Sequence, residues 1–178
     1  LEVPVGAGGI YLGGGWAQYA GTNVQDNTRV EAGAGFSYPI IRQQGAELLA
    51  GLDLVYFGFD RNLREFTFGQ GGYFSPQQYF AVNVPVDYRG RSGNLAWRLG
   101  GSVGYGTYRE DASPLFPTDA GMQRAVEARA RTDATVQARL PDRSRSGIVT
   151  GVRGELDVNL TPDLSLLGAV RFDKAPQF

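Results

Sequence analysis

Strict alternation of apolar and polar residues limits the fold of this chain more than any other feature. The segment 45–59 shows it best, because it places one set of residues on an apolar face, Leu48, Ala50, Leu52, Leu54 and Tyr56, and another on the opposite face, Glu47, Leu49, Gly51, Asp53 and Val55. Side chains of a strand point alternately to opposite faces, so such a segment is a strand with one apolar and one wet face. The same period predicts seven strands, at roughly 9–20, 28–40, 45–59, 78–88, 94–109, 145–160 and 163–174. We expect one all-β, antiparallel domain over residues 1–178.

Two kinds of all-β protein produce this alternation, the soluble sandwich and the transmembrane barrel. Charged residues in the middle of strands, such as Asp53 and Arg98, favour a face that is wet along its whole length. Aromatic residues near the ends of the apolar faces, such as Phe36 and Trp97, are typical of the girdles where a lipid-facing barrel meets the membrane boundary. In the segment 9–20, we expect Tyr11 and Tyr19 to face lipid, which turns Trp16 inward.

The connections between the predicted strands alternate in length. Short ones are expected at 42–45, 89–93 and 161–163, and long ones at 21–27, 60–77 and 110–144. Outer-membrane barrels have short periplasmic turns and long external loops, so this sorting favours an outer-membrane β-barrel. Seven strands do not close a bacterial barrel, which uses an even number, so we expect further strands before Leu1 and after Phe178. No signal peptide is visible at Leu1–Pro4, as expected for an interior fragment.

Composition excludes several functional classes. The sequence has no Cys or His, so disulfides, thiolate sites, histidine metal sites and the usual general base are absent. Its 17 Lys and Arg balance 18 Asp and Glu, which gives no basic footprint for nucleic acid. Glu155 and Asp157 share a face at a spacing that a glycosidase could use, but two acidic residues at i and i+2 are ordinary on a wet strand. We expect no enzyme activity, no metal and no cofactor.

Three segments carry a resemblance to a known family. They are Asn62–Phe80 (NLREFTFGQGGYFSPQQYF), Tyr108–Pro114 and Phe116–Asp119. Through these segments, and in order along the whole chain, the sequence resembles the C-terminal barrel of the outer-membrane cellulose export proteins that belong to bacterial cellulose synthase systems. The resemblance implies about half of a 16-stranded antiparallel transmembrane barrel in the bacterial outer membrane. It also implies export of cellulose, and coupling to an inner-membrane cellulose synthase through a periplasmic region of helical repeats.

Cellulose is a neutral, unbranched β-glucan with apolar ring faces and hydroxyl edges, and the inward residues suit both. We expect rings to stack on the faces of the sugars, at Trp16, Tyr79 and Tyr108. We expect polar side chains to bind the hydroxyl edges, at Asp53, Asn83, Arg98, Arg153, Glu155, Asp157 and Arg171. In the loop 60–77, Tyr73 and Phe74 should border the glucan path at the external mouth; the alternative is a buried aromatic plug.

Two other functions fit parts of the sequence. An export pore for another exopolysaccharide would have the same architecture, although a polyanion such as alginate calls for a basic lumen and the inward residues mix both signs. A soluble carbohydrate-binding sandwich would show the same alternation.

The last long loop has its own features. It contains a predicted helix at 121–131, and the stretch 121–145 carries six Arg against three acidic residues. That charge suits either contact with anionic lipopolysaccharide of the outer membrane or an ordinary solvated loop.

Overall fold

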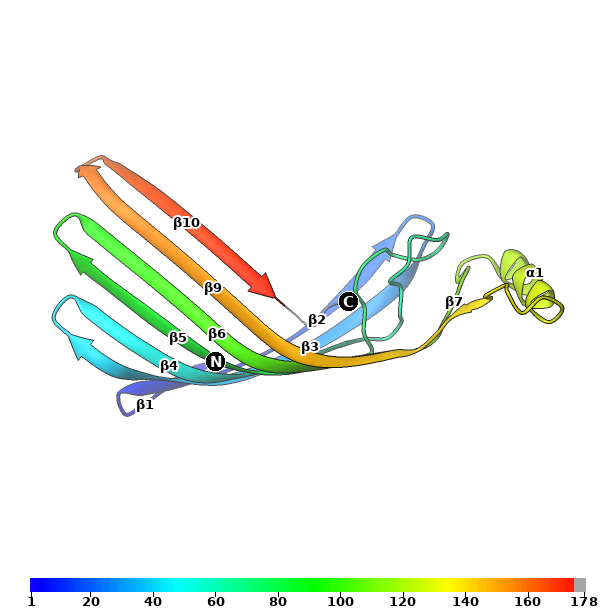
Figure 1. Cartoon of the computed structure of the whole chain (residues 1–178), viewed down its shortest axis with the longest axis horizontal. Coiled ribbons are helices and arrows are strands. Elements are labelled where there is room, and N and C mark those ends of the chain that lie inside the picture. The colour runs from blue at the N-terminus through cyan, green and yellow to red at the C-terminus, as the bar shows by residue number, and fades with distance from the viewer. Residues whose placement is uncertain (175–178) are drawn as a thin grey trace.

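Antiparallel strands follow one another in chain order across a single sheet, β1-β2-β3-β4-β5-β6-β9-β10 (Figure 1). The computed structural model describes residues 1–174. The strands of this sheet are β1 Glu2–Val5, β2 Gly8–Gly21, β3 Val24–Gln43, β4 Ala46–Phe59, β5 Gln78–Ser92, β6 Leu95–Glu110, β9 Arg143–Thr161 and β10 Leu164–Lys174. Between β6 and β9 lie a small ladder, β7 Ser113–Pro114 with β8 Arg139–Leu140, and the helix α1 Ala120–Ala130.

All seven predicted strands and the predicted helix are confirmed within a few residues. The prediction missed β1, a strand of four residues that includes Pro4 and lies at the edge of the sheet, where a missing amide donor is tolerated. Within residues 1–174 the eight strands form one layer that is not closed, without the second packed sheet of a sandwich. The strands expected beyond Phe178 lie outside the described residues.

The two ends of the sheet differ in their connections. At the short-turn end, four tight turns join β1 to β2, β3 to β4, β5 to β6 and β9 to β10. At the long-loop end, residues 60–77 join β4 to β5 and residues 111–142 join β6 to β9. The prediction of a long loop at 21–27 is wrong. Strand β2 continues to Gly21 and β3 begins at Val24, and the two-residue turn between them contains Asn23, which has a positive φ of 60°. Asn is one of the few residues that tolerate this conformation.

The strand register separates one polar face from one apolar face. On the polar face, Tyr11 lies opposite Gly35, Gly35 opposite Asp53, and Asp53 opposite Asn83. The apolar face includes large side chains that stay exposed, among them Leu52, Val84, Leu99, Val103, Tyr105, Ile148 and Phe172. Neighbouring strands agree on this division, as the alternation predicts.

Trp16 corrects the expected orientation of the first long strand. It lies opposite Val30 on the apolar face and is 66% exposed, whereas Tyr11 and Tyr19 lie on the polar face. The prediction that Trp16 faces inward was therefore wrong by one residue. Tyr11 and Tyr19 lie near the two ends of β2, as the residues of an interfacial girdle would, which led to the wrong prediction. The pairing of β2 with β3 places both on the polar face.

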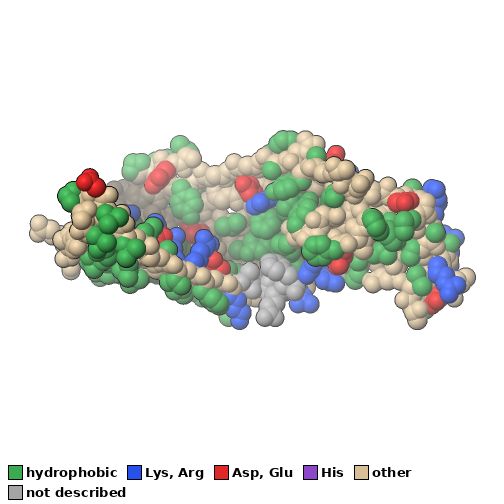
Figure 2. All heavy atoms as spheres, turned by 90° about the horizontal axis from the view of Figure 1, so that it is seen from above, with side chains coloured by type: hydrophobic (Ala, Val, Ile, Leu, Met, Phe, Trp, Pro, Cys, Tyr) green, Lys and Arg blue, Asp and Glu red, His purple; other side chains and the backbone are tan. Residues whose placement is uncertain are grey.

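The sheet is strongly curved, and its polar face lies inside the curve. The loop 60–77 sits within the curve at the long-loop end (Figure 1), and its rings pack on polar-face residues such as Phe57 and Tyr108. Seen from above, acidic and basic side chains gather side by side in the hollow (Figure 2). No helix within residues 1–174 has the length and apolar character needed to cross a membrane.

Candidate functional site: a polar groove closed by an aromatic loop

A groove runs along the polar face from the short-turn end toward the middle of the sheet. It consists of three adjoining hollows of about 390, 190 and 290 Å³. The first two hollows share Ser37, Leu49 and Arg89, and the second and third share Pro85 and Asp87. Because the hollows share lining residues, the polar face offers a continuous path rather than separate pockets.

Charged side chains of both signs line the central hollow. The Asp87 carboxylate accepts hydrogen bonds from Arg98 Nε at 3.0 Å and from Arg153 Nη2. On the neighbouring strand β10, Arg171 Nε donates to the carboxylate of Asp173, two residues further along the same strand, at 2.5 Å. The arginine side chains of these pairs are exposed and the Asp87 carboxylate is half-buried, so each pair contributes little to stability and the arginines remain available to a ligand.

Several predicted site residues come together here. Asp53 and Asn83 lie opposite each other on β4 and β5, and both line the central hollow with Arg153 and Arg171. Arg98 lines the adjoining hollow beside Asp87. The structure thus assembles five predicted residues from β4, β5, β6, β9 and β10 along one path.

Two glycines allow long side chains to cross a neighbouring strand. The Tyr11 hydroxyl on β2 donates to Asp53 on β4 by passing over Gly35, where an added Cβ would lie 2.2 Å from the ring. Arg153 on β9 reaches Asp87 on β5 over Gly100, where an added Cβ would lie 2.5 Å from its Nε. Close approach of this kind requires the absence of a Cβ. The two contacts connect strands that do not pair with each other.

Glu155 and Asp157 lie on the polar face, but away from the central hollow. Glu155 pairs in register with Arg98, and Asp157 with Ala96. Neither residue lines any of the three hollows. Within residues 1–174, no group of three acidic side chains is placed to hold a metal ion.

An aromatic cluster covers the polar face at the long-loop end. We use this name for Tyr19, Phe57, Phe59, Tyr73, Phe74, Tyr79 and Tyr108. Tyr73 stacks on Tyr19 with ring centroids 5.7 Å apart, and Phe74 meets Tyr108 edge to face at 5.0 Å. Tyr79 stacks on Phe57 at 4.5 Å. The rings from the loop thus pack between the loop and β2, β4, β5 and β6.

Buried polar groups fasten the same loop to the sheet. The fully buried Glu110 pairs with Arg64 at 2.8 Å, and the Ser75 hydroxyl accepts the Leu63 amide at 2.7 Å. Asn27, which is 1% exposed, donates to the Arg61 carbonyl at 2.8 Å and to the Tyr73 hydroxyl at 3.0 Å. Burial raises the pKa of Tyr73, although the hydrogen bond from Asn27 acts in the opposite direction. The loop is therefore a fixed part of the fold.

This packing changes the expectation for the predicted aromatic residues. Tyr108 was predicted to stack on a sugar. It is only 2% exposed beneath Phe74, so its ring has no free face for that contact. Tyr73 and Phe74 hold the loop on the sheet, which agrees with the plug alternative more closely than with a free platform. Tyr79 presents one face to Phe57.

The predicted site residues leave out three contributors to the site. Asp87 lies at the centre of the charged groups, Tyr11 crosses to Asp53, and Glu110 secures the loop. The alternation of β5 does indicate that Asp87 faces inward. The inward orientation of Tyr11 could have been inferred from the small residues on the same face of its strand, Gly13, Gly15 and Ala17. The inner face of a curved sheet is crowded and therefore favours small side chains. No local signal distinguishes Glu110 from the other acidic residues.

A groove with these groups suits a long neutral polyol. Its hydrogen-bonding groups recur along the path, both signs of charge are present, and no hollow is enclosed. A family model described as the C-terminus of cellulose synthase operon protein C matches residues 1–178. The chain belongs to this family.

Relatives of known name agree with the assignment to the cellulose synthase operon protein C family. One protein of that name from Komagataeibacter xylinus is 38% identical over 98% of this chain, and cellulose synthase 2 operon protein C from the same species is 44% identical over 82%. A Xanthomonas axonopodis pv. citri protein of the family is 34% identical over 93%. The chain spans 14%, 11% and 12% of the lengths of these relatives, respectively.

Proposed function

We propose that this chain forms part of a transmembrane β-barrel in the bacterial outer membrane, through which cellulose leaves the cell. The observation that carries the proposal is the division of one curved sheet into an exposed apolar face and a continuous polar groove. A barrel wall needs these two surfaces, since one side meets lipid and the other meets water. The names of the relatives associate them with cellulose synthesis and supply the substrate of the proposal.

The charges of the groove favour a neutral polymer. Asp53, Asp87 and Asp173 lie along the same hollows as Arg98, Arg153 and Arg171, so neither sign dominates the path. A polyanion would require a mainly basic lumen. Conduction of a chain also requires many weak contacts and no deep site, which matches hollows that adjoin one another.

The same proposal includes the neighbours of the barrel. Cellulose reaches the groove from an inner-membrane synthase, through a periplasmic region of helical repeats. Outer-membrane lipid covers the apolar face. Lipopolysaccharide meets the arginine-rich segment 121–145, whose helix α1 projects beyond the sheet in Figure 1. The protein acts as a passive pore, without a cofactor.

Blocking the groove tests the proposal directly. Asn83→Trp places a large ring in the central hollow of about 290 Å³, whereas Val84→Trp places the same ring on the apolar face, where Val84 is 44% exposed. Both variants are introduced into the full-length protein in a cellulose-producing bacterium that lacks its own copy. At equal levels in the outer membrane, Asn83→Trp should largely abolish secreted cellulose and Val84→Trp should preserve it. Equal secretion from both variants would contradict a path along this face.

A further inference from the structure

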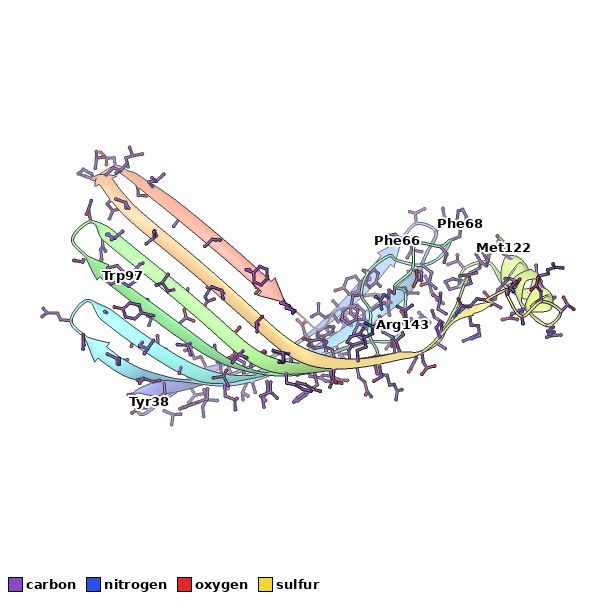
Figure 3. All side chains as sticks on the ribbon, in the orientation of Figure 1. Tyr38, Phe66, Phe68, Trp97, Met122 and Arg143 are labelled. Carbon is purple, nitrogen blue, oxygen red and sulfur yellow. The ribbon has the colours of Figure 1, made fainter. Side chains whose placement is uncertain are left out.

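Two rings of the loop 60–77 remain free while its other rings pack. Phe66 is 91% exposed and Phe68 is 75% exposed, and they differ in this from Tyr73 and Phe74 of the same loop. Both rings project from the upper end of the loop, away from Arg143 (Figure 3). The loop lies inside the curve of the sheet, so these rings do not belong to the apolar face.

The backbone that carries the two rings is held on both sides. The Gly69 carbonyl accepts the Gln25 amide at 2.8 Å, next to the β2–β3 turn. On the other side, the Thr67 hydroxyl donates to the Leu115 carbonyl at 2.7 Å, and Gln70 Nε2 donates to the Pro114 carbonyl at 2.8 Å. Gln70 itself is 5% exposed. Because the tip is fastened to two other segments, a ligand would meet rings whose positions are already set.

The ring of Phe66 also rests on a glycine. Gly72 has a positive φ of 68°, and an added Cβ would lie 2.5 Å from the Phe66 ring. One edge of the Phe66 ring thus lies beside the Gly72 backbone, while the side chain as a whole stays 91% exposed. An exposed aromatic ring on a backbone that is held in place offers a flat apolar face on which a pyranose ring can stack.

We infer that Phe66 and Phe68 form a stacking platform for the glucan where it passes the loop at the long-loop end of the sheet. The inference rests on the proposed function and adds a binding site to it. Thr67, with its hydroxyl, separates the rings, so the surface is narrow and interrupted, unlike an apolar patch that binds a protein. A β-linked glucan, with flat ring faces and hydroxyl edges, fits two separate rings on a polar loop.

The alternative occupant is protein, because the relatives are much longer than this chain. A glucan needs the flat faces of the rings, whereas a protein contact needs mainly their apolar bulk. Substitutions that change one of these properties and keep the other therefore distinguish the two occupants. In the full-length protein, Phe66→Leu with Phe68→Leu keeps apolar bulk and removes the flat faces. Phe66→Tyr with Phe68→Tyr keeps the faces and adds hydroxyls. Stacking tolerates the tyrosine pair, whereas a buried protein contact tolerates the leucine pair better.

Equilibrium binding of cellohexaose, measured by calorimetry on the purified full-length protein in detergent, tests the platform. The leucine pair should bind at least about fivefold more weakly than the unchanged protein, and the tyrosine pair within about threefold of it. Equal binding by the leucine pair would overturn the platform and leave the export function standing. If the unchanged protein bound no cellohexaose and supported no cellulose secretion, the export function itself would fail. Thermal unfolding of each variant checks that the fold is kept.

Discussion

Single residues on the inner face of the sheet decide which side chains meet across it. Tyr11 and Asp53 belong to strands that do not pair, and Gly35 between them leaves the space that the tyrosine ring occupies. Asp87 and Arg153 meet in the same way over Gly100. The inner face of a curved sheet is crowded, so glycine at these positions determines where polar groups can be placed.

Gly35 and Gly33 offer a matched comparison, because both lie on the polar face of β3. A methyl group at Gly35 would lie 2.2 Å from the Tyr11 ring, whereas at Gly33 its nearest neighbour is the Leu54 carbonyl at 3.6 Å. We expect Gly35→Ala to displace Tyr11 from Asp53 and to destabilise the protein by about 1–3 kcal/mol. Gly33→Ala should be close to neutral. Urea unfolding of the full-length protein measures both, and equal effects would show that the crossing of Tyr11 contributes nothing.

The sequence could predict the face of most residues, but not of those in β2. In β3, β4, β5, β6, β9 and β10 the alternation predicts both the strand and its polar side, including Asp53, Asn83, Arg98, Arg153 and Arg171. In β2 the polar face is built of glycine, alanine and two tyrosines, and the apolar face holds Trp16 and Gln18. The two faces of β2 do not differ clearly in hydrophobicity, so only the pairing of β2 with β3 shows which face is polar.

At the scale of elements, the loop 60–77 gives the molecule most of its buried interior. The sheet is a single layer with solvent-exposed side chains, whereas Leu63 is 1% exposed, and Ser75 and Glu110 are 0% exposed where the loop meets the strands. The sequence shows the rings and polar residues of this loop. It does not predict which rings pack, because that depends on contacts with β2, β4 and β6 that are distant along the chain.

Removing the packed rings should release the loop. We expect Tyr73→Ala with Phe74→Ala to lower the free energy of loop opening by at least about 2 kcal/mol, since both rings pack against the sheet. Trypsin cleavage at Arg61 and Arg64 of the folded full-length protein should then be faster by roughly thirtyfold. Phe68→Ala removes a ring that is 75% exposed and should leave the cleavage rate unchanged. Slow cleavage of the double variant would mean that the buried polar contacts alone hold the loop.

At the scale of the whole molecule, the structure is a curved wall with a polar inside and an apolar outside. The alternation of the sequence predicts this division, and the structure adds the curvature, the continuity of the groove and the loop that covers one end. The position of the loop did not follow from local sequence, because curvature results from all the strands together. The central claim is that the inner face meets water and glucan while the outer face meets lipid.

Cysteine labelling in intact outer membranes tests that claim most directly, because this sequence contains no cysteine of its own. Ser102 lines the central hollow, and the adjacent Val103 is 55% exposed on the apolar face. In the full-length protein, without other cysteines, a water-soluble maleimide should modify Ser102→Cys, and cellohexaose should slow the reaction. Val103→Cys should react only after detergent removes the lipid. Rapid labelling of Val103→Cys in the membrane, or no labelling of Ser102→Cys, would contradict the account.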